Sequence, residues 1–481
     1  MTRVETQPVT PETITPAIWR LAGVIALGAF AGGLDTSLVN IALETIRNRF
    51  HAGIGLAQWI ASGYLLALAV SLPVCAWLGR RFGVGRLYLA ALGAFTVISA
   101  LCGLAPSIGI LIFLRVLQGL TAGLLVPAGQ TILGQAVGPG RLGRVMARLG
   151  IAVVLAPALG PTIGGLMLHA LSWRWLFLVN VPIGVVAIAL GWRYLPREKG
   201  GTTTPLDWVG YGYLGLGLPL LVYGLTTWGE LGSPNGLRVL LPLGLGVVGL
   251  VAFARHALHR EHPLLDVRLF RNSGYVAACA GFAFNGALSF GSALLFPLYF
   301  QLLHADGVVS AGLQMLPLGL GTAIMLPLSG RLTDKYTGGP VAVAGAGLTT
   351  LATGAFAVAG HPGPVFVQIL LFAIGMGTAL ATTPMMVAAF GLVARDRLPD
   401  ATAQINILVR IGGALGAALF SVIVARGMSD GIGHAFHTAL WWQFGMAVAV
   451  LLGALGLWWS RSAATRPARS NPLSTGRPDH G

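Results

Sequence analysis

The chain has 481 residues, of which 55% are hydrophobic and only 9% are charged, and its mean hydropathy is +0.78. A water-soluble domain carries about 25% charged residues, so this composition excludes a soluble enzyme, an RNA-binding module and a disordered scaffold. A membrane-spanning helix needs about 20 mostly apolar residues. The length and composition therefore predict an all-α polytopic membrane protein.

The apolar runs predict fourteen membrane-spanning helices, separated by clusters of charged residues, proline and glycine. Residues 1–17 are polar, and the apolar run that follows is too long for the core of a signal peptide. We therefore expect an uncleaved first helix. The predicted limits are 18–43, 58–79, 87–105, 109–136, 149–171, 174–194, 207–228, 238–257, 274–303, 309–330, 340–360, 364–390, 402–425 and 437–459.

The basic residues predict the orientation of these helices. The net charge is +15, and with an N-terminus inside the cell 23 of the 30 basic residues fall in cytoplasmic segments and 5 in outer segments. The remaining two, Arg115 and Arg410, lie within spans. This bias agrees with the positive-inside rule, and an odd number of spans would invert it. Both termini are therefore predicted to be cytoplasmic.

A weak internal repeat divides the chain. The segment 76–83, Ala-Trp-Leu-Gly-Arg-Arg-Phe-Gly, is echoed at 330–338 by Gly-Arg-Leu-Thr-Asp-Lys-Tyr-Thr-Gly. Repeated halves are typical of secondary transporters, whose binding sites lie between the halves. The spans then divide into a cytoplasmic segment 1–17, a six-helix bundle 18–195, two additional helices in 196–272, a second six-helix bundle 273–460 and a disordered tail 461–481.

Asp35 is the only acidic residue well inside a predicted span. A carboxylate at this depth is costly and is a functional-site hypothesis by default. Burial raises the pKa of a carboxyl group and a nearby cation lowers it, so such a group can couple proton movement to transport. The alternative is a structural carboxylate hydrogen-bonded between helices.

Arg115 is the natural partner of Asp35. The segment 114–123 places Gln118 and Gly119 on the same helical face as Arg115, at spacings of three and four residues. A guanidinium stays charged and needs polar partners, so we favour a gating or proton-relay role for this face. In the fifth span, Ala156, Gly160 and Gly164 recur every four residues and predict a close helix contact.

These features together resemble the major facilitator superfamily, and specifically its fourteen-helix drug:proton antiporters of the EmrB/QacA type. The residues that carry the resemblance are Leu-Asp-Thr-Ser-Leu-Val-Asn-Ile-Ala-Leu at 34–43, Gln-Trp-Ile-Ala-Ser-Gly-Tyr at 58–64, the Arg115 face, residues 156–165, residues 173–184 and Asp-Trp-Val-Gly at 207–210. The resemblance implies two six-helix bundles plus two extra helices, proton coupling through Asp35 and Arg115, and no cofactor or metal. It implies gating residues at Arg80, Arg81, Gly83, Asp334, Gln118, Gly119, Gly160, Pro161, Gly164 and Gly165.

The chain departs from this family in its loop motif. The family carries an acid where this chain has Arg80, so the latch of the inner gate that the resemblance implies lacks its acid here. Asp334 keeps the acidic position in the second copy.

The same fold implies a central cavity lined by residues of the facing helices. The candidates for substrate binding are Trp59, Tyr64, Phe284, Asn285, Phe296, Tyr299, Gln301, Gln314 and Asn406. Because Asp35 is the only deep acid, we expect neutral, zwitterionic or monocationic hydrophobic substrates. Dications should be exported poorly, unless Asp207 or Glu44 supplies a second charge.

The sequence thus predicts proton-coupled efflux of hydrophobic or amphipathic small molecules across the bilayer of a bacterial cytoplasmic membrane. Two alternatives remain: a dedicated exporter of one metabolite, and a transporter-like membrane sensor. The chain has no phosphate-binding loop for ATP coupling, and neither an enzyme activity, a nucleic-acid partner nor a periplasmic adaptor is implied.

Overall fold

The computed structural model describes residues 14–137, 139–196, 200–201, 204–232, 236–303, 308–359 and 363–464. These residues are helical almost throughout. In lipid, an apolar segment has no water to bond its backbone polar groups, and a helix pairs these groups within the segment. The N-terminal segment before Ile14 and the tail after Ala464 lie outside the described residues, so the predictions made for them are not addressed.

The first six-helix unit comprises seven helices, since one predicted span is built from two. Its helices are α1 (Pro16–Arg49), α2 (Ile54–Phe82), α3 (Val84–Gly103), α4 (Ile108–Ala136), α5 (Leu142–Ala170), α6 (Trp175–Leu178) and α7 (Asn180–Tyr194). The predicted span 174–194 corresponds to α6 and α7 together.

Two further helices, α8 (Trp208–Leu231) and α9 (Leu237–His259), precede the second six-helix unit. A 3-10 turn, η2 (Val267–Arg271), leads into that unit. Its helices are α10 (Ser273–Leu298), α11 (Val308–Gln314), α12 (Leu316–Tyr336), α13 (Gly338–Ala359), α14 (Pro364–Phe390), α15 (Leu398–Gly427) and α16 (Ile432–Ala464). A π-helical turn, η3 (Tyr299–Leu303), extends α10.

Thirteen helical segments are long and apolar enough to cross a membrane by length and composition alone, within the described residues. The helix α5, with 29 residues, is not among them, and adding it gives the fourteen spans that the sequence predicts. The fold class is therefore confirmed: an all-α membrane protein of two six-helix bundles with two additional helices.

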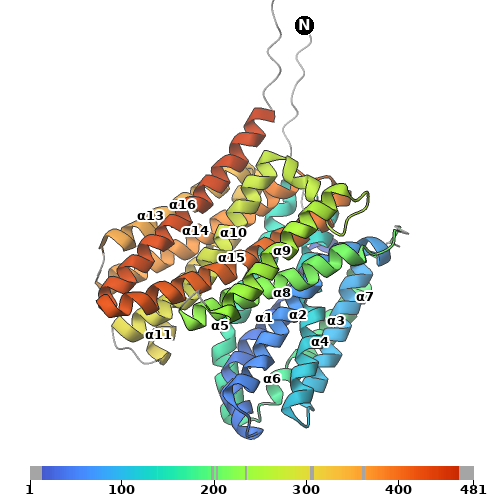
Figure 1. Ribbon diagram of the computed structural model, residues 1–481. Helices are drawn as coiled ribbons and strands as arrows, with labels where there is room; N and C mark the ends of the chain where they lie inside the picture. The colour runs from blue at the N-terminus through green and yellow to red at the C-terminus, as the bar shows by residue number, and fades with distance from the viewer. Residues whose placement is uncertain are drawn as a thin grey trace, which may run out of the picture.

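Both ends of the described chain lie at the same end of the bundle, because α1 begins there and α16 finishes there (Figure 1). We call this the terminal end, and the opposite end, where α6 and α11 lie, the far end. The green helices α8 and α9 lie between the two units in this view. The helix α8 packs against α2 of the first unit and α15 of the second.

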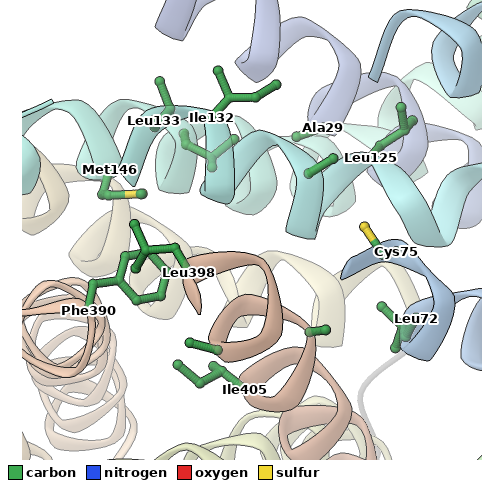
Figure 2. Close-up of a cluster of buried hydrophobic side chains, with 14 of the residues drawn as sticks. Ala29, Leu72, Cys75, Leu125, Ile132, Leu133, Met146, Phe390, Leu398 and Ile405 are labelled. Atoms are coloured by element: carbon green, nitrogen blue, oxygen red, sulfur yellow. The ribbon is translucent and has the colours of Figure 1, made fainter. Parts of the chain in front are cut away.

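Apolar side chains close the two units against each other toward the terminal end. Figure 2 shows Leu133 and Met146 of the first unit facing Phe390 and Leu398 of the second, within one cluster of buried residues. A Cβ atom on Gly134 would lie 3.3 Å from the Leu398 side chain. Interiors are close-packed, and at this point the two units are in direct contact.

Candidate functional site

A buried ion pair joins α1 to α4. Arg115 donates from Nη1 to Oδ2 of Asp35 at 2.5 Å, and both side chains are at most 1% exposed. Asp35 lies in the middle of α1, and the small residues around it let α1 approach its neighbours. The structure thus brings together the two residues that the sequence singled out for proton coupling.

Two amides complete the environment of the Asp35 carboxylate. Gln118 donates from Nε2 to Oδ1 at 3.1 Å, and Asn180 donates from Nδ2 to the same oxygen at 2.9 Å. Asn180 also donates to Ser99 Oγ at 3.2 Å, and Ser99 donates to the Phe177 carbonyl. Sequence reasoning assigned no role to Asn180. Asn180 could have been recognised from the sequence as an amide side chain within the apolar segment 176–183.

The Arg115 guanidinium has further partners besides Asp35. It donates from Nη1 to Gln118 Oε1 at 2.7 Å and from Nε to the Ile60 carbonyl at 3.2 Å. Its carbon lies 4.1 Å from the centre of the Tyr64 ring, a cation–π geometry. Four helices, α1, α2, α4 and α7, therefore converge on one charge pair.

Small residues permit this convergence. A Cβ atom on Gly119 would lie 2.3 Å from the Tyr64 carbonyl oxygen, and one on Gly123 would lie 2.1 Å from Ser71 Oγ. The helices α2 and α4 can therefore touch backbone to backbone at the level of the ion pair, and any side chain at Gly119 would push them apart.

The predicted contact face of α5 packs against α1. A Cβ atom on Gly160 would lie 2.1 Å from Ser37 Oγ and 2.4 Å from Ser37 Cβ, and one on Gly164 would touch Leu38 and Ile41. Ala156 is fully buried on the same face. Gly165, by contrast, has no neighbour within 4 Å of such an atom among the described residues. The Pro161 side chain lies outside the described residues.

Arg80 forms an ion pair across the two units at the terminal end. Its Nη1 donates to Asp400 Oδ2 of α15 at 2.6 Å, and its Nη2 donates to the Leu264 carbonyl at 3.4 Å. The other Asp400 oxygen accepts from the backbone N–H of Asp266. Despite the departure from the family motif, Arg80 therefore takes part in an ion pair between the units, because an acid on α15 meets it.

A second ion pair lies where α5 meets α12. Arg144 Nε donates to Asp334 Oδ2 at 2.6 Å, and the Gly143 N–H donates to Oδ1 at 2.9 Å. The predicted gating residue Asp334 thus links the two units. Of the other predicted gating residues near this end, Arg81 is exposed, and Gly83 has φ +88°, a backbone conformation that glycine tolerates, in the turn between α2 and α3.

Uncharged polar pairs continue the contact between α4 and α15. Thr131 and Thr402 are joined through their hydroxyls at 2.8 Å. One turn further along α15, Asn406 Nδ2 donates to Gln130 Oε1 at 2.7 Å. Asn406, predicted to bind substrate, therefore bridges the units in this conformation.

The remaining candidates for substrate binding are scattered. Trp59 and Phe284 are 46% and 42% exposed, Gln314 accepts from Gln368 at 3.3 Å, Asn285 donates to Thr382, and Gln301 is half-buried. Phe296 and Tyr299 are at most 1% exposed and pack on Phe356 within the second unit. In this conformation these two rings present no surface to a central cavity.

Neither acid at a span end reaches the ion pair. Asp207 accepts from the N–H groups of Gly210 and Leu264 and contacts His256 Nε2 at 2.9 Å. Burial alone would raise the pKa of Asp207, but these hydrogen bonds outweigh burial, and the pKa lies below its usual range. Glu44 is bound to Arg47 at the far end of α1. A second carboxylate for a dication is therefore not supplied by these residues.

An apolar cavity of about 440 Å³ lies between α8, α9, η2 and α15. Its lining includes Leu214, Phe253, Leu265 and Ile411. None of the predicted substrate residues lines it, so it is not the central cavity that the sequence led us to expect.

Two helical units that meet at one end, with a buried charge pair in the first, define a secondary-transporter architecture. The chain matches the Major Facilitator Superfamily over residues 25–417 and belongs to that family. It is 34% identical over 418 residues to the multidrug resistance protein B homolog of Mycobacterium tuberculosis, covering 86% of this chain and 77% of that protein.

Two other similarities extend this result. The multidrug export protein EmrB of Haemophilus influenzae is 29% identical, over 84% of this chain and 80% of that protein. The structure of the proton:xylose symporter XylE has a TM-score of 0.63 at 13% identity, over 92% of this chain and 95% of that one. The second likeness shows the fold alone, and the relatives confirm the resemblance to the EmrB type.

Proposed function

We propose that this protein exports hydrophobic or amphipathic small molecules from the cytoplasm of a bacterium in exchange for protons. The similarity to proteins named as multidrug exporters over most of the chain supports the export of drugs. The observation that carries the proton coupling is the fully buried Asp35–Arg115 pair, a charge placed where a membrane protein seldom keeps one without a use.

The proposed mechanism is alternating access between the two six-helix units. The terminal end corresponds to the cytoplasm, because the basic residues gather there, and the ion pairs of Arg80 and Arg144 hold that end closed. In the proposed cycle, a proton from the outer side binds to Asp35. Its protonation would weaken the bond to Arg115 and free α1 and α4 to move relative to each other.

The Asp35 site can support this exchange without a cofactor or a metal. The carboxylate has donors from α4 and α7 that stabilise its charged form, and the guanidinium has the Ile60 carbonyl and the Tyr64 ring as partners that do not depend on the charge of the carboxylate. The pair thus has two arrangements that differ by one proton, which is the property that coupling requires.

The test uses inside-out vesicles, with a neutral fluorescent dye added to the outside medium. An imposed proton gradient should drive dye uptake into vesicles that contain the protein, and dye addition should dissipate the gradient. Uptake that requires ATP, or that ignores the gradient, would refute proton antiport. Uptake of only one compound out of a chemically varied panel would favour the alternative of a dedicated exporter.

A further inference from the structure

Arg410 is a second arginine inside the membrane-spanning region, and neither the proposed coupling nor the latches use it. It lies on α15, 12 residues after Leu398, which places it about 18 Å along the helix from its start at the terminal end. Among the residues that the structure describes, it makes no hydrogen bond or ion pair. A charge in this position is costly without a partner, so its retention calls for one.

The face of α15 that carries Arg410 points toward the first unit. Thr402, Asn406 and Arg410 are spaced by four residues and share one helical face. The first two bind Thr131 and Gln130 of α4. One turn nearer the far end, Arg410 follows on the same face, makes no such link among the described residues, and is partly exposed. Arg410 therefore lies just beyond the last of these polar links between the units.

The groups that face Arg410 cannot neutralise it. The Tyr64 side chain of α2 lies within electrostatic range of Arg410, but its ring is already stacked on Arg115. Gln130 of α4 is bound to Asn406. Asp35 is the one acid deep in a span, and its charge is balanced by Arg115 at 2.5 Å. The space between the units therefore carries one net positive charge, from Arg410.

We propose that Arg410 is a substrate-binding residue that pairs with the carboxylate or sulfonate of anionic amphipathic substrates. A guanidinium presents planar donors that match such an acceptor in a bidentate manner. The inference rests on the proposed export function and narrows its substrates. It differs from the expectation of neutral, zwitterionic or monocationic substrates, which left the Asp35 carboxylate free for a cation, whereas Arg115 is paired with that carboxylate.

The test compares three dansyl probes of similar size on the purified full-length protein in detergent: dansylglycine, an anion; dansylglycinamide, which is neutral; and dansylethylenediamine, a cation. The wild-type protein should bind the anion most tightly by fluorescence titration. Arg410→Gln should raise the Kd of dansylglycine by about tenfold, as expected for one charge-assisted hydrogen bond, and change that of dansylglycinamide by less than about threefold. Arg410→Lys should keep a preference for the anion but bind it more weakly than the wild type, because it keeps the charge and loses the planar pair of donors.

The matched control is Arg426→Gln, on the same helix at the far end, where the exposed guanidinium donates to the Gly232 carbonyl. It should leave all three Kd values unchanged. Wild-type binding of dansylglycine no tighter than that of dansylglycinamide would overturn the inference, as would an equal loss of both probes in Arg410→Gln. The titration uses neither a membrane nor a gradient. Its result therefore does not depend on whether the vesicle experiment shows proton antiport.

Discussion

Asp35 accepts three hydrogen bonds in a site from which its side chain has no exposed surface. Removing one member of such a buried pair costs about 3–5 kcal/mol, because the other charge is left uncompensated. The two amides limit this cost for the carboxylate, and the Tyr64 ring and Ile60 carbonyl limit it for the guanidinium. Each member of the pair therefore keeps polar or aromatic partners besides the other.

The first prediction concerns the proton itself. Asp35→Asn keeps the shape of the side chain and removes its titration, so proton-driven export should be lost while detergent-solubilised protein still binds substrate. Dye uptake into vesicles at matched expression measures the first, and fluorescence titration the second. Glu44→Gln, an exposed acid on the same helix, serves as the control and should transport normally. Normal uptake by Asp35→Asn would remove Asp35 from the mechanism.

The second prediction separates the charge of Arg115 from its geometry. Arg115→Lys retains a cation beside Asp35 but loses the planar fork that reaches Ile60, Gln118 and Asp35 together. We expect transport to fall by about tenfold or more, since a point charge does not replace a multidentate one. The initial rate of dye uptake checks this. Full activity would show that the charge alone suffices, and Arg47→Lys at the exposed end of α1 controls for the substitution.

At the scale of the helix, the contact between α1 and α5 depends on a missing side chain. A Cβ atom on Gly160 would overlap both Oγ and Cβ of Ser37, and rotation of the Ser37 hydroxyl cannot relieve the second overlap. This contact sets how closely α5 approaches the helix that carries Asp35. It therefore connects packing to the geometry of the ion pair.

The third prediction follows from this contact. Gly160→Ala should destabilise the protein by about 1–3 kcal/mol, the usual cost of overpacking a close contact, and should slow transport. Gly165→Ala, five residues along the same helix, adds the same methyl group where no described neighbour lies within 4 Å, and it should behave as the wild type. Thermal unfolding in detergent compares the two variants. Equal melting temperatures would show that α1 and α5 can move apart to admit the methyl group without loss of stability.

The helices were predictable from the sequence, and parts of the site were not. Long apolar runs bounded by charged residues report directly on spans, so the fourteen helices followed from composition. Asp35 and Arg115 were found because a lone charge stands out in an apolar run. Asp400 was missed because an acid at the start of a span is indistinguishable from a loop acid. Its partner Arg80 lies 320 residues away in sequence, and no local pattern encodes that pairing.

At the scale of the whole molecule, the two latches occupy equivalent positions with opposite polarity. Arg80 is the third residue from the end of α2, and Asp334 is the third from the end of α12. Their partners, Asp400 and Arg144, are each the third residue of α15 and α5. The internal repeat thus places a basic residue in one copy and an acidic residue in the other, and each finds its complement across the interface. Arg80 is thus the charge-reversed counterpart of Asp334.

The last prediction tests this equivalence by exchanging charges. Arg80→Asp alone places two carboxylates together at the terminal end and should favour its opening. The double variant Arg80→Asp with Asp400→Arg restores an ion pair of the polarity found in the Arg144–Asp334 latch, and it should recover closure. Spin labels at positions 86 and 336, on the first and second units, report the separation of this end after replacement of the buried native cysteines.

The single variant should broaden and lengthen the measured distance distribution, and the double variant should return it toward that of the wild type. Arg395→Asp reverses an exposed charge at the same end and controls for a change in net charge. Asp400→Arg alone places two guanidinium groups together and should also open this end. Recovery in the double variant then requires that the two residues act as a pair, because two independent opening effects would add. An equal opening in the single and double variants would show that the apolar contact of Leu133, Met146, Phe390 and Leu398 closes this end without help from the charges.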